Sequence, residues 1–271
     1  MTLLARLLET VEQRFPLAGA EEWDRPGLTT GSPTQHVKKV LLSVDVTAAV
    51  VAEAIEGEFD LLLAHHPYLL RGVNTVAEST AKGAVLANAI RSGLAIYSAH
   101  TNADIVENGV SDTIAKRLGL HAIQPLLPSA DGVGHGRVGL LGDSTTLGQF
   151  ARQLAQVFPA TASGIRVAGH YDAPISKVAL CGGAGDSFLP QAMATGADVY
   201  ISSDLRHHVV QDAREAGVAG GSGIAVVDVS HWAAEWLWLE QLALELRTLH
   251  PEVSFEICDL RTDPWDFVVT Q

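Results

Sequence analysis

The sequence is poor in cysteine and in positive charge. Its two cysteines, Cys181 and Cys258, rule out a disulfide framework and a thiolate zinc cluster. Both lie in apolar runs, so we expect small buried core residues. Lys and Arg number 18 against 31 Asp and Glu, a formal net charge of −13. Because an acidic surface repels phosphate backbones and anionic lipids, we expect neither non-specific nucleic-acid binding nor attachment to a membrane.

The sequence also lacks any apolar run that approaches the roughly 20 residues of a membrane-spanning helix. Residues 1–8 lack the basic start, the long apolar run and the cleavage site of a signal peptide, and they fit an amphipathic helix instead. Together with the scarcity of cysteine, these features predict a cytoplasmic protein. Hydrophobic residues make up 47% of the 271, which is enough to bury the core of one large domain or of two ordinary ones.

Short apolar runs alternate with stretches of helical period, which is typical of α/β units on a largely buried sheet. Strands are predicted at residues 39–44, 60–64, 94–99, 137–141, 177–181, 198–201, 224–229 and 253–257. Helices are predicted at residues 48–55, 80–91, 110–118, 147–158, 188–194, 207–216 and 231–249. This pattern favours an α/β fold of two lobes, each with a central sheet flanked by helices.

The two lobes are predicted to be domains at residues 1–126 and 127–271, with the last helix and strand free to pack on the first lobe. Residues 127–136 hold one proline and three glycines and are the expected linker. Both lobes carry the same order of motifs: strand, helix, strand, His-His, then strand, His and an acid four residues later. The matching residues are Lys39, His65-His66, His100 and Asp104 in the first copy and Lys177, His207-His208, His231 and Glu235 in the second. The repeat predicts pseudo-symmetric lobes whose strand ends face a shared cleft.

His65-His66-Pro67 follows a predicted buried strand. Adjacent side chains within a strand point to opposite faces, but at a strand end the backbone can turn. Pro67 holds His66 in the extended region, so the two imidazoles can diverge toward two neighbouring metal ions. Taken alone, the pair is more typical of a polar loop after a buried strand.

His231 and Glu235 lie one turn apart if a helix begins near Ser230, a suitable N-cap. An imidazole and a carboxylate at this spacing can coordinate one cation, and the second carboxylate oxygen can coordinate a neighbouring cation. A surface His–Glu hydrogen bond is the simpler interpretation. However, the flanking Trp232 and Trp236 predict a buried helix start, where an unpaired carboxylate is costly.

Asp104 follows another strand end, four residues after His100. Asp104 is expected to complete the ligands of one ion, with a structural Asx turn as the alternative. His100 takes the place of His231 in the repeat, and we expect it either to support the metal ligands from behind or to contact the substrate, rather than to bind the metal. The predicted metal ligands are His65, His66, Asp104, His231 and Glu235. This mixed imidazole and carboxylate set suits Zn, Fe, Mn, Ni or Co, whereas Mg prefers all-oxygen ligands.

Each of two further motifs is consistent with two interpretations. The run Gly182-Gly183-Ala184-Gly185 after a strand fits either a phosphate cradle at a helix start or a tight turn. It lacks the lysine and hydroxyl of a P-loop. Asp204, His207 and His208 either line the cleft or form an ordinary capped helix start.

Several blocks of this chain resemble the type-2 GTP cyclohydrolase I homologues, also called Nif-three-like or DUF-thirty-four proteins. The blocks are, in order, Trp23-Asp24-Arg25-Pro26-Gly27-Leu28, Asp45-Val46-Thr47, His65-His66-Pro67, His100-Thr101-Asn102-Ala103-Asp104, Gly182-Gly183-Ala184-Gly185, Ser203-Asp204-Leu205-Arg206-His207-His208, and Ser230-His231 with Glu235. They span essentially the whole chain. The sequence departs from the family at Arg25-Pro26, where Asn-Val is frequent, and at Ser230, where Gly is frequent. Neither departure touches an expected ligand.

The resemblance implies a Nif-three-like fold, two divalent metal ions and a toroidal homo-hexamer with the metals facing an interior cavity. Carried over residue by residue, His65 and His231 would hold one ion, and His66 and Asp104 the other. Glu235 would bridge both. Some relatives carry an insertion between the lobes for which this chain is too short.

The implied function is a dinuclear-metal-dependent hydrolase, in which a metal-activated hydroxide attacks a nucleotide-like small-molecule substrate. In the cyclohydrolase reaction the point of attack would be C8 of GTP. His100 and His208 are then the candidates for proton transfer or substrate contact. The alternative is a non-catalytic metal-binding hexamer that serves in assembly or regulation. A purely structural metal site is less consistent with the number of ligands.

Overall fold

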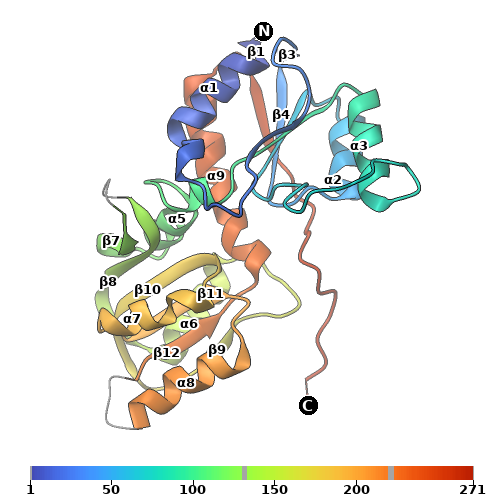
Figure 1. The fold of residues 1–271 in the computed structure, drawn as a ribbon. Helices are drawn as coiled ribbons and strands as arrows, with labels where there is room; N and C mark the ends of the chain where they lie inside the picture. The colour runs from blue at the N-terminus through green and yellow to red at the C-terminus, as the bar shows by residue number, and fades with distance from the viewer. Residues whose placement is uncertain (1, 130–132, 219–222, 271) are drawn as a thin grey trace. The chain divides into compact units, whose positions relative to one another are not determined.

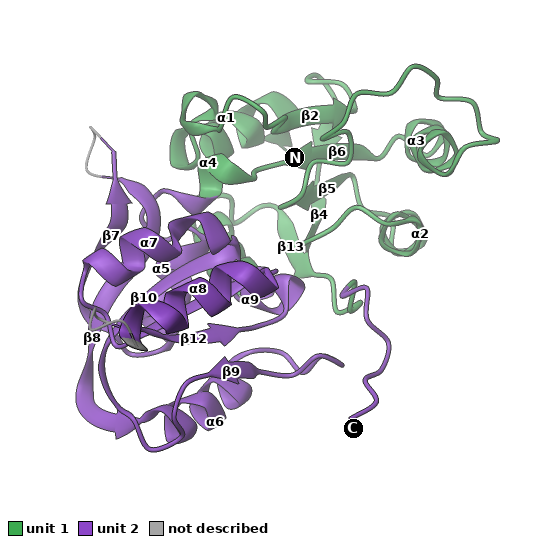
Figure 2. Cartoon of the chain, turned by 60° about the horizontal axis from the view of Figure 1, so that its bottom comes forward, with its two compact units in different colours: residues 1–103, 239–262 green, residues 104–238, 263–271 purple. Residues whose placement is uncertain are grey.

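The computed structural model describes residues 2–129, 133–218 and 223–270 (Figure 1). The chain forms two compact units, each discontinuous in sequence (Figure 2). Unit 1 comprises residues 1–103 and 239–262, and unit 2 comprises residues 104–238 and 263–271. The end of the last helix and the last strand therefore belong to unit 1. The division into independent domains at residue 126 stays a prediction, because a compact unit is not by itself a folding domain.

Unit 1 has a five-stranded sheet in the order β13-β4-β5-β6-β2, parallel except for β2. The strands of this sheet are β2 (Gly27–Thr30), β4 (Lys39–Ser43), β5 (Leu61–Ala64), β6 (Ala95–Ser98) and β13 (Ser254–Ile257). The strands β1 (Thr2–Leu3) and β3 (His36–Val37) pair in a separate antiparallel sheet of two strands. The unit also has several helices. Its helices are α1 (Leu4–Arg14), the short η1 (Leu17–Gly19), α2 (Ala48–Glu56), α3 (Ala81–Arg91), most of α4 (Thr101–Asp104) and the second part of α9 (His231–Leu249). Helices α2 and α3 cover one face of the sheet, and α1 and α9 the other (Figure 1). Coverage on both faces explains why all four residues of β5 are buried.

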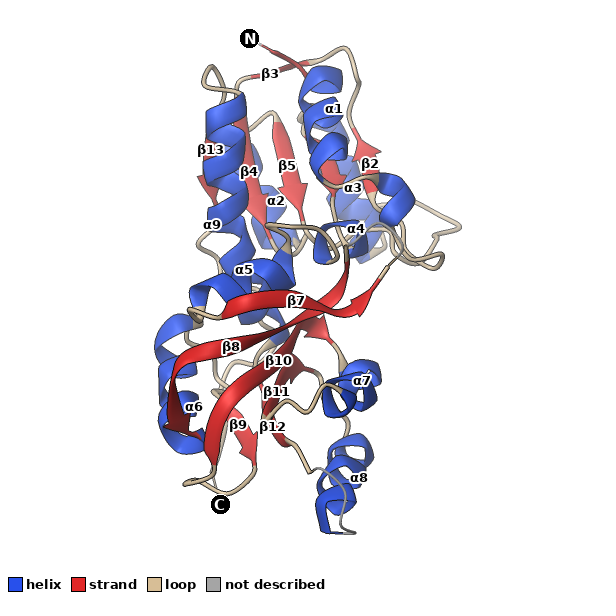
Figure 3. Ribbon diagram, turned by 90° about the vertical axis from the view of Figure 1, so that its left-hand side faces the viewer, coloured by secondary structure: helices blue, strands red, loops and turns tan. Residues whose placement is uncertain are grey.

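Unit 2 has a six-stranded sheet in the order β7-β8-β10-β11-β12-β9. Its strands are β7 (His121–Pro128), β8 (Gly134–Thr146), β9 (Arg166–Ala168), β10 (Pro174–Ala184), β11 (Val199–Ser203) and β12 (Ala225–Asp228). Its helices are α5 (Val110–Arg117), α6 (Leu147–Val157), the short η2 (Asp186–Phe188), α7 (Leu189–Ala194), α8 (His207–Val218) and the start of α9. Of the described neighbours in this sheet, β10 with β11 and β11 with β12 pair in parallel, and the other pairs are antiparallel. Helices α7 and α8 cover one face of this sheet and α6 the other (Figure 3).

The expected elements are present. Each predicted strand and helix overlaps one in the structure, which confirms the α/β fold with sheets flanked by helices. The N-terminal helix begins at Leu4, since Thr2 and Leu3 form the short strand β1. Cys181 and Cys258 are both buried, as expected. Among the described helices, none is both long and apolar enough to cross a membrane.

The prediction omitted the antiparallel edge strands β2, β7 and β9. These strands are partly exposed and of mixed polarity, so they lack the apolar runs by which the central strands were found. The expected linker at residues 127–136 is not a free linker in its described part. Residues 127–128 end β7, residues 134–136 begin β8, and the two strands pair. Leu127 pairs with His135, and Pro128 pairs with Gly134. A Cβ atom at Gly134 would lie 2.1 Å from the Leu127 carbonyl oxygen, so this glycine permits a close strand approach. Residues 130–132 lie outside the described residues.

The internal repeat recurs in local detail within each unit. In unit 1, the Asp60 carboxylate accepts hydrogen bonds from the backbone N–H groups of Lys38 and Lys39, at 2.7 and 3.0 Å. In unit 2, the Asp198 carboxylate accepts from the backbone N–H of Lys177 at 2.8 Å and from that of Ser176 at the same distance. Each aspartate thus ties the start of the second parallel strand of its sheet to the start of the first.

Candidate metal centre

Unit 1 gathers three histidines at the ends of β5 and β6. His65 and His66 follow β5, and their backbone N–H groups donate to the carbonyls of Ser43 and Val44, at 3.0 and 2.8 Å. The ring centroids of His65, His66 and His100 lie 5.0 to 5.3 Å apart. One ligand nitrogen from each ring lies within 4.8 Å of the others, a spacing that allows a shared ion. His100 therefore belongs to the groups that can hold a metal, beside its expected role in substrate contact.

The Nδ1 atom of each of these histidines is already engaged. His65, which is fully buried, donates from Nδ1 to the Ala99 carbonyl at 2.9 Å. His66 lies with Nδ1 2.7 Å from Asp45 Oδ1, and His100 lies with Nδ1 2.7 Å from Asp24. An acceptor on Nδ1 places the proton there, so that the neutral ring carries its lone pair on Nε2. This is the arrangement that protein histidines use when they bind metals.

Asp24 is the most strongly perturbed carboxyl group in this cluster. Its burial alone would raise its pKa, but hydrogen bonds from His100, from Thr101 and from the Arg25 backbone outweigh that effect and lower the pKa to about 2. The hydroxyl of Thr101 donates to Asp24 Oδ2 at 2.5 Å. Asp24 is therefore ionised at neutral pH and fixes the orientation of the His100 ring.

Unit 2 carries the second set of candidate ligands on α9. Ser230 caps this helix as expected, because its hydroxyl accepts from the backbone N–H of Ala233 at 3.2 Å. His231 Nε2 lies 2.8 Å from Glu235 Oε1 across one helical turn, and His231 Nδ1 lies 2.7 Å from Asp204 Oδ2. Glu235 is only 2% exposed, so the helix start is buried as the flanking tryptophans predicted.

Two carboxylates therefore surround one imidazole. Burial would lower the pKa of His231, but the charges of Glu235 and Asp204 outweigh it and raise the pKa to about 11. Asp204 adopts a left-handed backbone conformation with φ of +54°, which is uncommon for a residue other than glycine. His231 thus has the buried Glu235 carboxylate at one ring nitrogen and the exposed Asp204 carboxylate at the other, a concentration of negative charge that a divalent cation stabilises.

Asp104 and Glu235 lie in the same part of unit 2. Burial raises the pKa of the Cys181 thiol to about 12, and the charges of both carboxylates, Asp104 first, add to that effect. Asp104 is the last residue of α4. Unit 2 therefore brings together three of the five predicted ligands.

The glycine run at the end of β10 has a packing role. Gly183 has a φ of +69°, and a Cβ atom there would lie only 2.7 Å from Glu235 Oε1 and 3.5 Å from His231 Nε2. A side chain at this position would occupy the space next to both candidate ligands. Gly183, which lies in the last part of β10, therefore has a packing reason, namely the space that it leaves beside Glu235.

The remaining predicted residues, His207 and His208, lie at the start of α8. Both are exposed, and their ring centroids lie 5.1 Å apart in an edge-to-face arrangement. His207 lines a cavity of unit 2 that is separate from the His231–Glu235 pair. The sequence patterns predicted no role for Asp24 or Asp45. Asp45 could have been found from its place two residues after the end of β4. Asp24 gives no comparable sign, because it meets His100 across 76 residues.

The sequence from residue 2 to residue 264 matches the profile of Duf34/NIF3 (NGG1p interacting factor 3). This chain belongs to the Duf34/NIF3 family. A relative from Streptomyces coelicolor named GTP cyclohydrolase 1 type 2 homolog is 39% identical, over 98% of this chain and 94% of the relative. A relative of the same name from Mycobacterium leprae is 30% identical, over 97% of this chain and 95% of its own length.

The alignment with the M. leprae relative runs over 372 positions, which is more than the 271 residues of this chain. The M. leprae relative therefore contains residues that this chain lacks. A Bacillus cereus protein related to NIF3 has the same fold, with a TM-score of 0.90 over 98% of this chain and 99% of that one. It is 24% identical in sequence. The Nif-three-like fold inferred from sequence motifs is thereby confirmed.

Replacing Asp204 by asparagine should weaken metal binding without unfolding the protein. In the Asp204→Asn variant a neutral amide replaces the charged acceptor that holds the His231 ring, and loss of such a partner typically costs about 10- to 100-fold in metal affinity. The measurement is the metal dissociation constant by competition with a chromophoric chelator. Asp212→Asn, an exposed site on α8, is the control and should bind metal as the parent does. An unchanged dissociation constant for Asp204→Asn would show that Asp204 does not support a ligand.

Proposed function

We propose that the histidine cluster of unit 1 and the carboxylates of unit 2 form one dinuclear metal centre of a hydrolase that acts on a nucleotide-like small molecule. The observation that carries the proposal is a hydrogen-bonding feature that His65, His66 and His100 share. Each has a hydrogen-bond acceptor on Nδ1, which selects the tautomer that ligates through Nε2. The buried Glu235 beside His231 supplies the anionic charge that a divalent ion needs. Imidazole and carboxylate ligands suit Zn, Fe, Mn, Ni or Co.

The ligand roles follow the family resemblance. His65 and His231 would hold one ion, His66 and Asp104 the other, and Glu235 would bridge the two. Two bound divalent ions would supply Lewis-acid activation of water and of the substrate. The nucleotide class of the substrate is supported by the name of the relatives, GTP cyclohydrolase 1 type 2 homolog.

His100 is the residue of this chain best placed to act on the substrate. Its Nδ1 is held by the ionised Asp24, so its Nε2 can accept a proton or a hydrogen bond. The exposed His208 is a second candidate for substrate contact. The pairing with Asp24 keeps the His100 ring in one orientation, which is what proton transfer at a fixed atom requires.

The test combines metal analysis with turnover. We expect the purified protein to hold two equivalents of metal per chain and to hydrolyse at least one member of a panel of nucleotides and phosphoesters, with formate release monitored for GTP. Removal of metal by a chelator should abolish turnover, and its return should restore it. Stoichiometric metal with no turnover of any panel member would refute the hydrolase and favour the alternative, a metal-binding assembly or regulatory protein.

A further inference from the structure

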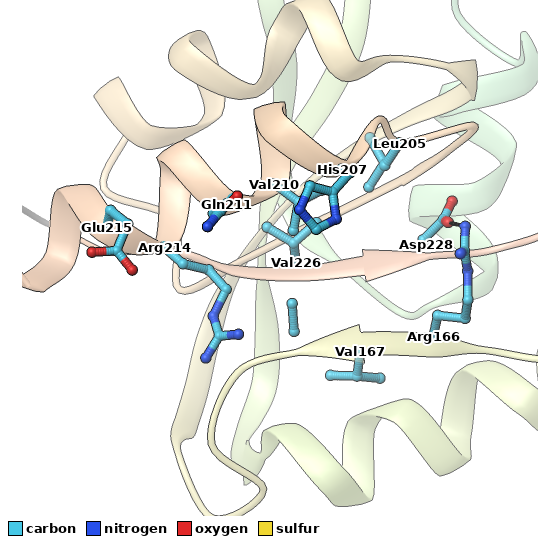
Figure 4. A pocket seen from close by; sticks show the side chains of 11 residues that line it. Arg166, Val167, Leu205, His207, Val210, Gln211, Arg214, Glu215, Val226 and Asp228 are labelled. Atoms are coloured by element: carbon cyan, nitrogen blue, oxygen red, sulfur yellow. Dashed lines mark hydrogen bonds and ion pairs between the residues drawn. The ribbon is translucent and has the colours of Figure 1, made fainter. Parts of the chain in front are cut away.

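Unit 2 contains a cavity of about 580 Å³ between α8 and the strands β9 and β12 (Figure 4). A volume of this size is in the range of small-molecule sites. The side chains that line it come from three elements and the loop before α8: Arg166, Val167, Ala168, Leu205, His207, Val210, Gln211, Arg214, Glu215, Val226 and Asp228. Neither the metal ligands nor the residues that hold them line this cavity, with the consequence that the metal proposal does not explain it.

The face of α8 that borders the cavity is polar. His207, Val210, Gln211 and Arg214 follow the spacing i, i+3, i+4 and i+7, so they form one stripe along the helix. In an amphipathic helix a stripe beside the sheet is usually apolar. Here three of its four residues are hydrogen-bond donors, and Arg214 extends from α8 toward β9 (Figure 4).

The two ends of the cavity each have an arginine, and these two arginines differ in whether they form an ion pair. At one end Arg166 forms an ion pair with Asp228, whose side chain is 12% exposed. At the other end lie Arg214 and Glu215 (Figure 4). Within the described ranges Arg214 forms no ion pair, in a chain whose formal net charge is −13. The guanidinium of Arg214 is therefore available to an anion that enters the cavity.

Between these ends the cavity has an apolar lining. Val167 on the edge strand β9 is 40% exposed and Val210 on α8 is half-buried, so both present apolar surface to the cavity. Val226 on β12 and Leu205, which are 2% and 9% exposed, lie behind them in the wall. A ligand with only an inorganic anion would leave this apolar surface in contact with water, whereas an anion carried on a flat apolar group would cover it.

We propose that this cavity binds a small organic anion, a phosphate or carboxylate group carried on an apolar body. Arg214 meets the anionic group, with Gln211 and His207 as further donors on the same stripe of α8. The apolar body packs on Val167 and Val210. This site is independent of the metal centre, so it stands whether or not the chain is a hydrolase.

The test uses minimal probes that contain only the proposed chemistry. Phenylphosphonate and benzoate present the anion on a flat apolar ring, benzamide is the neutral counterpart and benzamidine the cationic one. Binding to the full chain is followed by NMR of valine methyl groups, because Val167, Val210 and Val226 report on this cavity directly. We expect at least one anion to shift these methyl signals saturably, with a dissociation constant of about 1–10 mM for so small a probe. The stronger of the two anions shows whether the natural group is phosphate or carboxylate.

Variants of the arginine decide the outcome. Arg214→Gln should raise the dissociation constant of the anion about tenfold or more, whereas Arg214→Lys should retain most of the affinity because the charge remains. Arg152→Gln, an exposed arginine on α6, is the matched control and should leave binding unchanged. The proposal is overturned if neither anion shifts the three valines, if benzamidine binds as tightly as the anions, or if Arg214→Gln binds within twofold of the parent. None of these readouts depends on bound metal or on turnover.

Discussion

The Glu235→Ala protein is expected to retain neither metal ion after dialysis, whereas the parent retains two. Glu235 is buried, and its Oε1 atom lies 2.8 Å from His231 Nε2. If its carboxylate bridges both ions, removing it takes a ligand and a negative charge from each of them. Asp104→Ala removes a ligand from one ion only and should leave one equivalent bound. The measurement is metal per chain by inductively coupled plasma mass spectrometry.

Two further variants separate metal loss from unfolding. Glu235→Gln keeps the side-chain volume, and it should lose metal as Glu235→Ala does while retaining a cooperative thermal transition. Glu107→Gln, whose side chain is 85% exposed, is the control and should hold two equivalents. Two equivalents of metal in either Glu235 variant would show that Glu235 does not bridge the ions.

The Arg137→Met protein is expected to be less stable by about 3–5 kcal/mol, since this is the usual effect of removing one partner of a buried ion pair. Arg137 is 4% exposed, and its Nε atom donates to Asp112 Oδ1 at 2.9 Å. Its Nη1 atom also donates to the carbonyls of Gly134 and Gly136, at 2.8 and 2.7 Å. The substitution leaves these acceptors, all in unit 2, without their shared donor.

The free energy of unfolding from denaturant titration measures this effect, with Arg152→Met as an exposed control that should stay within about 0.5 kcal/mol of the parent. Adding Asp112→Leu to Arg137→Met should recover part of the loss, because the buried carboxylate that has lost its Arg137 partner is then removed as well. A loss below about 1 kcal/mol in the single variant would contradict the role given to the pair.

The effect of Arg137 should also depend on pH. Burial would raise the pKa of Asp112, but Lys116, the Asn108 backbone N–H and Arg137 outweigh it and lower that pKa. A lowered carboxyl pKa contributes stability that is present above the unfolded-state value and is lost as the pH falls through the folded-state value. The difference between parent and Arg137→Met should therefore shrink in acid.

The central strands and the helices were predictable because their signals are local. The strands β4, β5 and β6 are continuous apolar runs, as expected when helices cover both faces of a sheet. The edge strand β9 has only three residues and an exposed valine, so no run of sequence marks it. Its position follows from pairing with β12, and that pairing depends on the fold of the whole unit.

The candidate ligands were visible for a similar reason. The adjacent His65 and His66 lie at a strand end, and His231 and Glu235 lie one helical turn apart. Spacing along the chain is therefore enough to reveal each pair. Their partners were not visible, since Asp24 reaches His100 across 76 residues and Asp204 reaches His231 across 27. No periodicity connects residues so far apart.

By itself, the sequence determined which segments are strands and helices, that the chain carries a repeated α/β motif, and which histidines and carboxylates stand at strand ends. These features depend on hydrophobic period and on spacing, which are properties of short stretches. Only the tertiary structure decided which carboxylate holds which histidine, which glycine makes room for Glu235, and that a polar stripe of α8 borders a cavity. Those facts depend on which strands become neighbours, and packing rather than local sequence decides that.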